Sequence, residues 1–395
     1  KNQETVKSEF EKSIDEARKI QKDVEQLQKN LFEKKNLNYQ DKKQIEDLLK
    51  RQKTLQEQVE MMINQNEQSN KKESQYKEVN ESIAEKQKQL EKLFEEIMSD
   101  EMKKLFEELQ KMIEDIDKDK LDQVMDKMKF NAEDLEKSLD RNLELFKQLE
   151  FDKKLTETID NLKKLAEDQK ELSEQTKESK KEDVEKLSEE QKKIEDEFKK
   201  IGDDLKDLQD KNKELEEPNN FKIPEEKQSK INKELEDSKQ NLKQGQMKKA
   251  SDSQKEASDD MEEMGDMLAE MQEEMEEEAL GEDIEALRMI LENLVQSSFD
   301  QESLMDHLSK LGRNDPRYAQ ITEKQKAIKD NLLMIEDSLF ALSKRQPMIE
   351  PFVNREISTI NSNVDQTMQA LGARSFSAAL GKQQFVMTSV NNLAL

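Results

Sequence analysis

Three residues whose side chains could take part in hydrolysis lie close together in the last third of the chain. They are Ser303, Asp306 and His307, and His307 is the only histidine in the sequence. A hydrolytic triad also needs a shaped pocket and donors that hold an oxyanion, and nothing in this helical pattern predicts either. We therefore interpret His307 as a helix-surface residue and predict that the chain is not an enzyme.

The sequence also lacks the motifs that hold metals or cofactors. Neither of the glycine-rich loops that cradle phosphates is present. The chain has no cysteine and a single histidine, which are too few ligands for the common zinc sites. We predict no catalytic residues, no metal site and no cofactor.

An acidic run occupies positions 273–278, and its residues Glu273, Glu274 and Glu277 are candidates for binding a charged partner. A straight helix cannot wrap carboxylates around calcium as a calcium-binding loop does, so a solvated helix face is the first interpretation. Like charges four residues apart, as at Glu270 and Glu274, repel each other. A basic partner, in another chain or another helix, would relieve this repulsion and is the second interpretation.

Methionines recur at helical spacing just before and within the acidic run, and we predict that they share one helix face. Methionine side chains fill irregular cores and also line adaptable binding grooves. The face is therefore either an ordinary core seam or a deformable surface on which a partner docks. The residues are Met261, Met264, Met267, Met271 and Met275.

Helix-breaking residues are rare in this chain. Its 395 residues include only 7 glycines and 5 prolines, with no glycine before Gly202 and no proline before Pro218. Charged residues make up 41% and apolar residues 32%, whereas a compact globular domain is nearly half apolar. Because Glu, Lys, Gln, Leu and Met all favour helices, the composition predicts long helices with narrow apolar seams.

The formal net charge of −26 restricts the partners. Phosphate contacts need clustered lysine and arginine, so we predict no nucleic-acid binding, and we expect a charged protein partner to present a basic surface. No stretch reaches the roughly 20 apolar residues of a membrane-spanning helix, so we predict no direct membrane insertion by this segment. The chain starts at Lys1 rather than Met, and we expect it to be part of a longer protein.

The clearest seam lies between positions 184 and 215, where apolar residues alternate at steps of three and four. Sustained over several heptads, this spacing is typical of a coiled coil. Gln191 and Asn212 place polar side chains in the seam, where they fix the register at some cost in stability. The predicted seam residues are Val184, Leu187, Ile194, Phe198, Ile201, Leu205, Leu208 and Leu215.

Helix boundaries are predicted from capping residues, glycines and prolines. Asn38 followed by Asp41 indicates the start of a helix, and Asn131 before two acids indicates another. The sharpest break is Glu217–Pro224, in which Pro224 suits the first position of the next helix. Gly281 is interpreted as a helix end or kink, where a strongly acidic segment gives way to one with nearly balanced charge.

Helices joined by short turns pack in opposite directions. We therefore predict an all-α fold of long antiparallel coiled-coil hairpins with a C-terminal helical bundle. Residues 1–216 are assigned to a coiled-coil rod, 217–224 to a linker, 225–281 to an acidic Met-rich helical segment and 282–395 to the bundle. The oligomeric state stays open, because the seams permit either a hairpin within one chain or a homo-oligomer such as a parallel dimer.

Several short segments, most of them in the last third of the chain, carry a resemblance to a known family. They are Asp41–Leu48, Leu291–Leu294, Ser298–Glu302, Asp315–Tyr318, Asp337–Arg345 and Thr388–Leu395. Together they resemble a family of very large, uncharacterised cell-envelope proteins of Bacteroidetes, which have amino-terminal membrane helices and a long helical region. The resemblance implies a place on the periplasmic side of a bacterial envelope, anchored by segments outside this chain, with the cytoplasm as the alternative.

These expectations favour a structural role. We expect a non-catalytic scaffold that spaces or assembles a protein complex of the cell envelope. One alternative is a chaperone-like or regulatory module that holds a client with the Met-rich acidic helix. Another is the coiled-coil portion of a larger mechanochemical envelope protein whose motor lies elsewhere.

Overall fold

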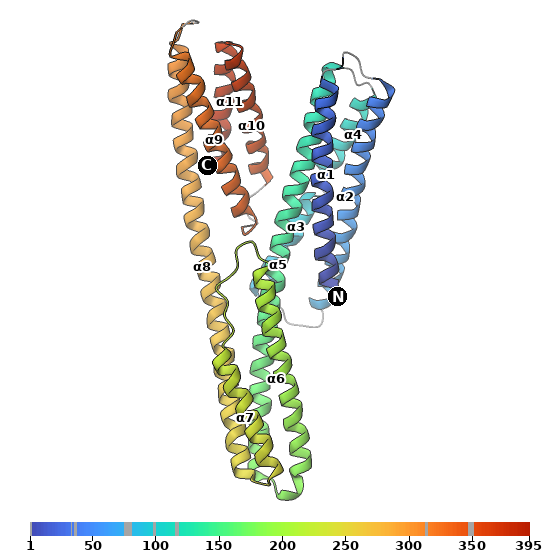
Figure 1. Ribbon diagram of the computed structural model, residues 1–395, viewed down its shortest axis with the longest axis vertical. Helices are drawn as coiled ribbons and strands as arrows, with labels where there is room; N and C mark the ends of the chain where they lie inside the picture. The colour runs from blue at the N-terminus through green and yellow to red at the C-terminus, as the bar shows by residue number, and fades with distance from the viewer. Residues whose placement is uncertain are drawn as a thin grey trace. The chain divides into compact units, whose positions relative to one another are not determined.

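The computed structural model describes residues 2–32, 34, 38–74, 81–97, 100–114, 118–312, 315–346 and 351–395. Throughout these residues the regular structure is helical, with eleven α-helices, one short 3-10 helix and no strand (Figure 1). The all-α fold predicted from the sequence is therefore confirmed for the described part of the chain. The helices are α1 (Asn2–Phe32), α2 (Tyr39–Ser74), α3 (Glu81–Ile97), α4 (Asp100–Glu114), α5 (Lys118–Glu178), η1 (Lys181–Asp183), α6 (Val184–Lys213), α7 (Glu225–Lys243), α8 (Met247–Ser309), α9 (Tyr318–Ser343), α10 (Pro351–Gly372) and α11 (Phe376–Ala394).

The chain divides into two compact units. Unit 1 contains Lys1–Phe146 and Glu282–Leu395, and unit 2 contains Lys147–Gly281. The chain passes from one unit to the other inside α5 and again inside α8. These two helices have 61 and 63 residues, whereas the average helix of a globular protein has about 11–12.

The helix start predicted at Asn131 is wrong, and so is the interpretation of Gly281 as a helix end. α5 continues through Asn131, which is buried at 2% exposure because Met128 and Leu135 on either side keep this stretch of α5 in a core. α8 continues through Gly281, where no neighbouring residue lies within 4 Å of the position a Cβ would occupy. A glycine costs a helix about 1 kcal/mol relative to alanine, and the packing of the rest of α8 outweighs that cost.

Unit 2 is built around one core to which α5, α6, α7 and α8 all contribute (Figure 1). Its buried side chains include Phe151 of α5, Phe198 of α6, Ile231 of α7 and Met264 of α8. Each helix offers a seam too narrow to be stable in water alone, so burial against the other three supplies most of its stability.

The segment between α6 and α7 folds back on the unit 2 core. Asn212 donates from Nδ2 to the Asn219 carbonyl and accepts from the Asn219 amide, both at 2.8 Å. Phe221 is 6% exposed and meets the Phe151 ring edge-on, with the ring centroids 5.6 Å apart. The predicted break before α7 is therefore confirmed, with the difference that Pro224 is the N-cap of α7 and not its first residue.

The first group of helices in unit 1 includes α1 and α2, which pack against each other. Arg51 of α2 pairs with Glu16 and Asp23 of α1 at 2.8 and 2.6 Å. The start of α2 is the predicted one, since the Asp41 amide donates to Asn38 Oδ1 at 2.9 Å and the Asn38 amide to Asp41 Oδ2 at 3.0 Å. Each side chain thus satisfies an amide that the helix leaves without a partner.

The second group in unit 1 consists of α9, α10, α11 and the last part of α8. These helices surround a core of their own, which contains Ile290 and Leu294 of α8, Ile328 of α9, Val364 of α10 and Val386 of α11. Helices α10 and α11 pack closely against each other along this core.

Candidate functional site

The seam predicted in α6 lies inside the unit 2 core. Val184, the first residue of α6, is half-buried, and the other predicted seam residues are buried. Leu215 follows the end of α6 and is buried in the turn after it. The buried residues are Leu187, Ile194, Phe198, Ile201, Leu205, Leu208 and Leu215. They hold unit 2 together and present no surface to a partner.

The predicted methionine face is interrupted. Met261 and Met264 are fully buried in the core and Met275 is 7% exposed, whereas Met267 is 40% exposed. The core-facing place in that turn of α8 belongs to Leu268, one residue later and about 100° around the helix. Met271 is only partly buried at the edge of the core. The prediction of one shared face is therefore wrong at Met267, and no continuous methionine stripe is open to a partner here.

Glu273, Glu274 and Glu277 are exposed on the solvent side of α8. This is the placement expected of a solvated helix face, and binding of a basic partner by these residues stays a prediction.

The three residues considered for hydrolysis do not converge. His307 is exposed and its Nδ1 lies 2.6 Å from the Ser303 carbonyl on the same helix. Asp306 instead accepts from Lys310 Nζ at 2.6 Å, and this hydrogen bond lowers the pKa of the Asp306 carboxyl. The hydrogen bonds of Asp306 and His307 thus stay within one helix.

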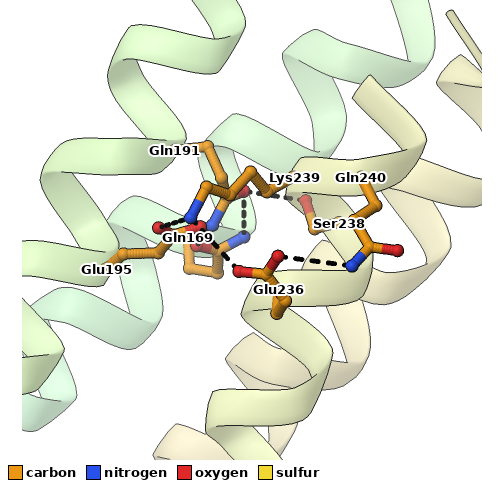
Figure 2. A network of polar contacts seen from close by, with 7 residues as sticks. All are labelled: Gln169, Gln191, Glu195, Glu236, Ser238, Lys239 and Gln240. Atoms are coloured by element: carbon orange, nitrogen blue, oxygen red, sulfur yellow. Dashed lines mark hydrogen bonds and ion pairs between the residues drawn. The ribbon is translucent and has the colours of Figure 1, made fainter. Parts of the chain in front are cut away.

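A layer of buried polar side chains crosses the unit 2 core. Gln169 of α5 and Gln191 of α6 exchange two hydrogen bonds, with Nε2–Oε1 distances of 3.3 and 3.2 Å (Figure 2). Gln191 Oε1 also accepts from Ser238 Oγ of α7 and from Gln254 Nε2 of α8, each at 2.9 Å. All four side chains are fully buried. One residue from each of α5, α7 and α8 therefore donates to a single acceptor on α6.

Charged residues extend this network toward solvent (Figure 2). Lys239 of α7 donates to Glu195 of α6 at 2.8 Å and to Glu236 of its own helix at 3.2 Å. These hydrogen bonds raise the pKa of the Lys239 ammonium. Gln240 Nε2 donates to Glu236 Oε1 at 3.3 Å. The contacts between α6 and α7 thus run from the buried layer to the surface.

The C-terminal core of unit 1 contains a matching layer. Gln301 of α8 and Gln325 of α9 exchange hydrogen bonds of 3.2 and 2.9 Å, and Gln383 Nε2 of α11 donates to Gln325 Oε1 at 2.7 Å. Thr367 of α10 is fully buried and donates to the backbone of its own helix. Gln325 of α9 is therefore the central acceptor of this layer, as Gln191 of α6 is in unit 2.

The two layers belong to two copies of one four-helix pattern. Corresponding residues, most of them in the two cores, are separated by one constant interval along each pair of matching helices. Along α5 and α8, Asn161, Leu162, Asp168, Gln169 and Leu172 match Asn293, Leu294, Asp300, Gln301 and Leu304. Along α6 and α9, Gln191, Ile194, Ile201, Leu205 and Leu208 match Gln325, Ile328, Ile335, Leu339 and Leu342. From α7 into α8 and from α10 into α11, Ile231, Ser238, Leu242, Ala250 and Gln254 match Ile360, Thr367, Leu371, Ala379 and Gln383.

In this tandem arrangement α8 is the fourth helix of the first copy and the first helix of the second. The repeat is not among the features predicted from the sequence, although the glutamines with their flanking isoleucines and leucines are a signal that could have revealed it.

An ionic cluster joins α7 and α8 in unit 2. Lys227 and Lys230 contact the two carboxylate oxygens of Asp260 at 2.8 and 2.6 Å. Burial, together with a hydrogen bond to Asp260, raises the pKa of the neighbouring Glu234 to about 7. Burial also acts to raise the pKa of Asp260, and its hydrogen bonds to the lysines and Glu234 outweigh that effect and lower it. Glu234 therefore titrates near neutral pH.

A second ionic group lies within unit 1. Lys137 of α5 contacts Glu336 Oε1 of α9 at 2.7 Å, and Asn361 Nδ2 of α10 donates to Glu336 Oε2 at 2.7 Å. A hollow of about 590 Å³ adjoins this pair and is lined in part by Asp134, whose pKa is raised by burial. Both oxygens of Glu336 therefore already have donors, and Glu336 links α5, α9 and α10.

These features define the class of the protein: all-α in its described residues, with long helices organised around buried glutamine layers. No protein-family model, curated protein or solved structure matches the chain. Within the described residues, no helix has a stretch both long enough and apolar enough to cross a lipid bilayer.

Proposed function

We propose that this chain is a non-catalytic, extended coiled-coil scaffold of the bacterial cell envelope that spaces or assembles a complex of other proteins. In this proposal its long helices pair as antiparallel hairpins. The observation that carries the proposal is the continuity of α5 and α8, each of which supplies residues to both compact units. At 1.5 Å per residue, a helix of 61 residues is about 90 Å long.

The buried glutamine layers support the same proposal. A polar layer in a helical core stabilises less than leucine would, and it excludes registers that leave its amides without partners. A spacer needs a defined length, so fixed register has a direct use here. Both copies of the four-helix pattern keep such a layer, around Gln191 and around Gln325.

The place in the envelope rests on the resemblance of the C-terminal segments to envelope proteins of Bacteroidetes. An anchor outside this chain belongs to the same proposal. The chaperone-like alternative, which needs an open methionine face, is not favoured because Met261 and Met264 are fully buried.

The scaffold proposal is tested by native purification of the full-length protein after mild cross-linking, with mass spectrometry of what accompanies it. We expect a reproducible set of partners in fixed stoichiometry. The matched variant is Gly281→Pro, which breaks α8 between the two units at a position with no neighbouring side chain. A scaffold that depends on α8 continuity keeps individual partners in this variant and loses the joint complex. Absence of any stoichiometric partner, or a complex indifferent to the break, would count against the proposal.

A further inference from the structure

The first helices of unit 1 carry a further copy of the four-helix pattern. Along α2 and α6, one constant interval relates Leu48, Gln52, Leu55, Val59 and Met62 to Leu187, Gln191, Ile194, Phe198 and Ile201. From α4 into α5 and from α7 into α8, the interval that separates Gln254 from Gln383 relates Leu109, Ile113, Leu121, Met125 and Leu135 to Ser238, Leu242, Ala250, Gln254 and Met264. All of these residues of α2, α4 and α5 are buried.

Contacts between the helices support this correspondence. Helix α2 packs against both α1 and α4. Gln28 of α1 donates to Asp126 of α5 at 2.9 Å, and Lys127 of α5 pairs with Glu108 of α4 at 3.6 Å. We call α1, α2, α4 and the first part of α5 the N-terminal copy. Helix α5 is its last helix and the first helix of unit 2, as α8 is shared between the two copies described above.

The glutamine layer is reduced in the N-terminal copy. Gln52 takes the place of Gln191 and is 1% exposed. The two residues that donate to Gln191 from α7 and α8 have Leu109 and Met125 as their counterparts, and both are fully buried. Among the described residues of α1, Ser13 is the one buried polar side chain. No matching amide or hydroxyl therefore meets Gln52 from α4 or α5 at these positions.

The hydrogen bond that Gln52 makes does not select one register. Gln191 binds side chains, each of which occurs at a single height along its helix. Gln52 Nε2 instead donates to the Met128 backbone carbonyl at 2.8 Å, and every residue of a helix presents such a carbonyl. Polar core residues fix register only when a shift leaves them without partners. The seam of α2 on either side of Gln52 is apolar, so a shift exchanges one apolar residue for another.

A second register would satisfy buried atoms that have no partner in the first. Within the described residues, no hydrogen bond reaches Gln52 Oε1 or either side-chain polar atom of Asn131, which is 2% exposed. Asn131 lies about one helical turn after Met128 along α5. A shift of α2 by that turn brings Gln52 level with Asn131, and two amides can exchange two hydrogen bonds. Pairing them removes the cost of burying unpaired polar atoms.

Helices α1 and α2 would make this shift together. Arg51 of α2 pairs with Glu16 and Asp23 of α1 at 2.8 and 2.6 Å. Lys34, just after α1, pairs with Asp41 of α2 at 2.6 Å. These contacts join the two helices at the middle and at the connection between them.

The ionic contacts from α1 to α5 lie at the surface. Arg18 is half exposed and pairs with Glu136 at 2.7 Å. Asp140 lies one turn further along α5, in the direction that brings Gln52 to Asn131, and its charge already acts on Arg18. Glu25 pairs with Lys129 at 2.9 Å, with both side chains more than one-third exposed. Surface ion pairs contribute little to stability, so they do not hold the register by themselves.

We propose that the helix pair α1–α2 has two registers against α5, one helical turn apart, and that the N-terminal copy is therefore a register switch. In one register Gln52 binds the Met128 carbonyl, and in the other it pairs with Asn131. Movement of one packed element past another by a turn is a known type of switching transition. The layer around Gln191 keeps the matching helices of unit 2 in one register. This inference goes beyond the scaffold role and requires no partner protein.

The test measures the position of α2 along α5 in the whole chain. The sequence has no cysteine, so introduced cysteines can carry nitroxide labels at Asn64 of α2 and Gln123 of α5, which are both exposed. We expect pulsed electron resonance to give two distances that differ by up to about 5 Å, the pitch of one helical turn. The matched pair is Asp203 of α6 and Asp252 of α8, also exposed, and there we expect a single distance.

Three variants of the N-terminal label pair test the cause of the two distances. Met125→Gln places an amide where α8 has Gln254, so that it can donate to Gln52 Oε1, and we expect one distance. Asn131→Leu removes the partner of the second register, and we again expect one distance. Met125→Leu is the control, because it keeps an apolar side chain of similar size, and it is expected to keep both distances. Circular dichroism checks that each variant stays helical.

A single distance in the parent N-terminal pair would overturn the inference, whether or not the variants fold. Two distances in both label pairs would also overturn it, because the glutamine layer would then make no difference. The same holds if Met125→Gln and Met125→Leu give the same distribution. None of these results bears on the partners that accompany the full-length protein, so the register switch and the scaffold role can fail separately.

Discussion

Gln169 of α5 and Gln191 of α6 face each other in the unit 2 core and exchange two hydrogen bonds, at 3.3 and 3.2 Å. An amide is both donor and acceptor, so a pair of glutamines can satisfy part of its demand without water. Gln191 Oε1 also accepts hydrogen bonds from Ser238 and Gln254. These bonds fix the axial register of α7 and α8 against α5 and α6. A shift of any one helix by one turn would replace its polar residue with an apolar one and leave buried amides unpaired.

Removing the central acceptor alone is predicted to be costly. Gln191→Leu leaves the buried donors of Gln169, Ser238 and Gln254 without their common partner, and we expect the free energy of unfolding of unit 2 to fall by about 1–3 kcal/mol. Urea unfolding followed by hydrogen exchange of unit 2 amides measures this loss. Replacing Gln169, Gln191 and Gln254 by leucine and Ser238 by alanine together should recover most of it, since no polar group is then left unpaired. This account of the layer would be contradicted if Gln191→Leu left the free energy of unfolding unchanged while the combined fourfold replacement lowered it.

The turns after α7 and α10 give a second prediction. Gly245 and Arg374 both have positive φ, 68° and 53°, and matching hydrogen bonds run from Gln246 to the Asn241 carbonyl and from Ser375 to the Ala370 carbonyl. A side chain in this left-handed conformation costs about 1–2 kcal/mol relative to glycine. The same conformational free-energy cost is expected at both turns, because the repeat places these two residues at matching positions.

Glycine is therefore expected to exceed alanine by about 1 kcal/mol of stability at either position. At the first turn the comparison is the parent chain against Gly245→Ala. At the second it is Arg374→Gly against Arg374→Ala, because both variants lose the guanidinium contact with the Tyr318 ring, 5.2 Å from its centroid. Equal stability of alanine and glycine at both turns, measured by thermal unfolding, would show that the two turns do not demand this backbone conformation.

Glu234 gives unit 2 a predicted pH dependence. Its pKa is raised from the ordinary value of 4.5 to about 7, first by burial and then by the hydrogen bond to Asp260. Between about pH 4.5 and 7 the folded chain therefore holds a proton that the unfolded chain has released. The free energy of unfolding contributed by this group falls as the pH rises through that window.

Glu234→Gln keeps the shape of the protonated side chain and removes its titration. We expect this variant to lose the decline in the urea midpoint of unit 2 between pH 5 and pH 7 and to be more stable than the parent chain at pH 8. The matched control is Glu226→Gln, an exposed glutamate of the same helix. The interpretation fails if the Glu234 and Glu226 variants have the same pH profile.

The particular residues show how far the sequence could predict this fold. Heptad spacing correctly predicted which seam residues of α6 are buried between Leu187 and Leu208, because a narrow stripe on a long helix has one face to bury. Asn38 with Asp41 correctly predicted the start of α2, because a capping box depends only on neighbours in sequence. Local sequence patterns were therefore sufficient to predict the buried face of α6 and the start of α2.

The rest depended on packing that no local pattern contains. Asn131 is a residue type that often caps helices. It lies within α5 nevertheless, because the apolar residues on either side of it are buried in a core. Gln191 was recognised as a register residue, yet its partners Ser238 and Gln254 come from distant parts of the chain. Met267 and Leu268 differ by one step around α8, and only the position of the other helices decides which of them is buried.

Continuity of α8 through Gly281 gives a last prediction. The chain has no cysteine, so two introduced cysteines can carry nitroxide labels at Glu256 and Asp300, which are both exposed. A continuous helix separates these positions by about 65 Å, and pulsed electron resonance should give one narrow distance distribution near that value. Gly281→Ala is expected to keep the distance and to raise stability by about 1 kcal/mol, because nothing lies near the added methyl group. Gly281→Pro is expected to shorten and broaden the distribution, because proline removes a helical hydrogen bond and bends the backbone. A broad distribution in the parent chain would mean that the glycine already acts as a hinge, and the spacing role proposed for α8 would then be lost.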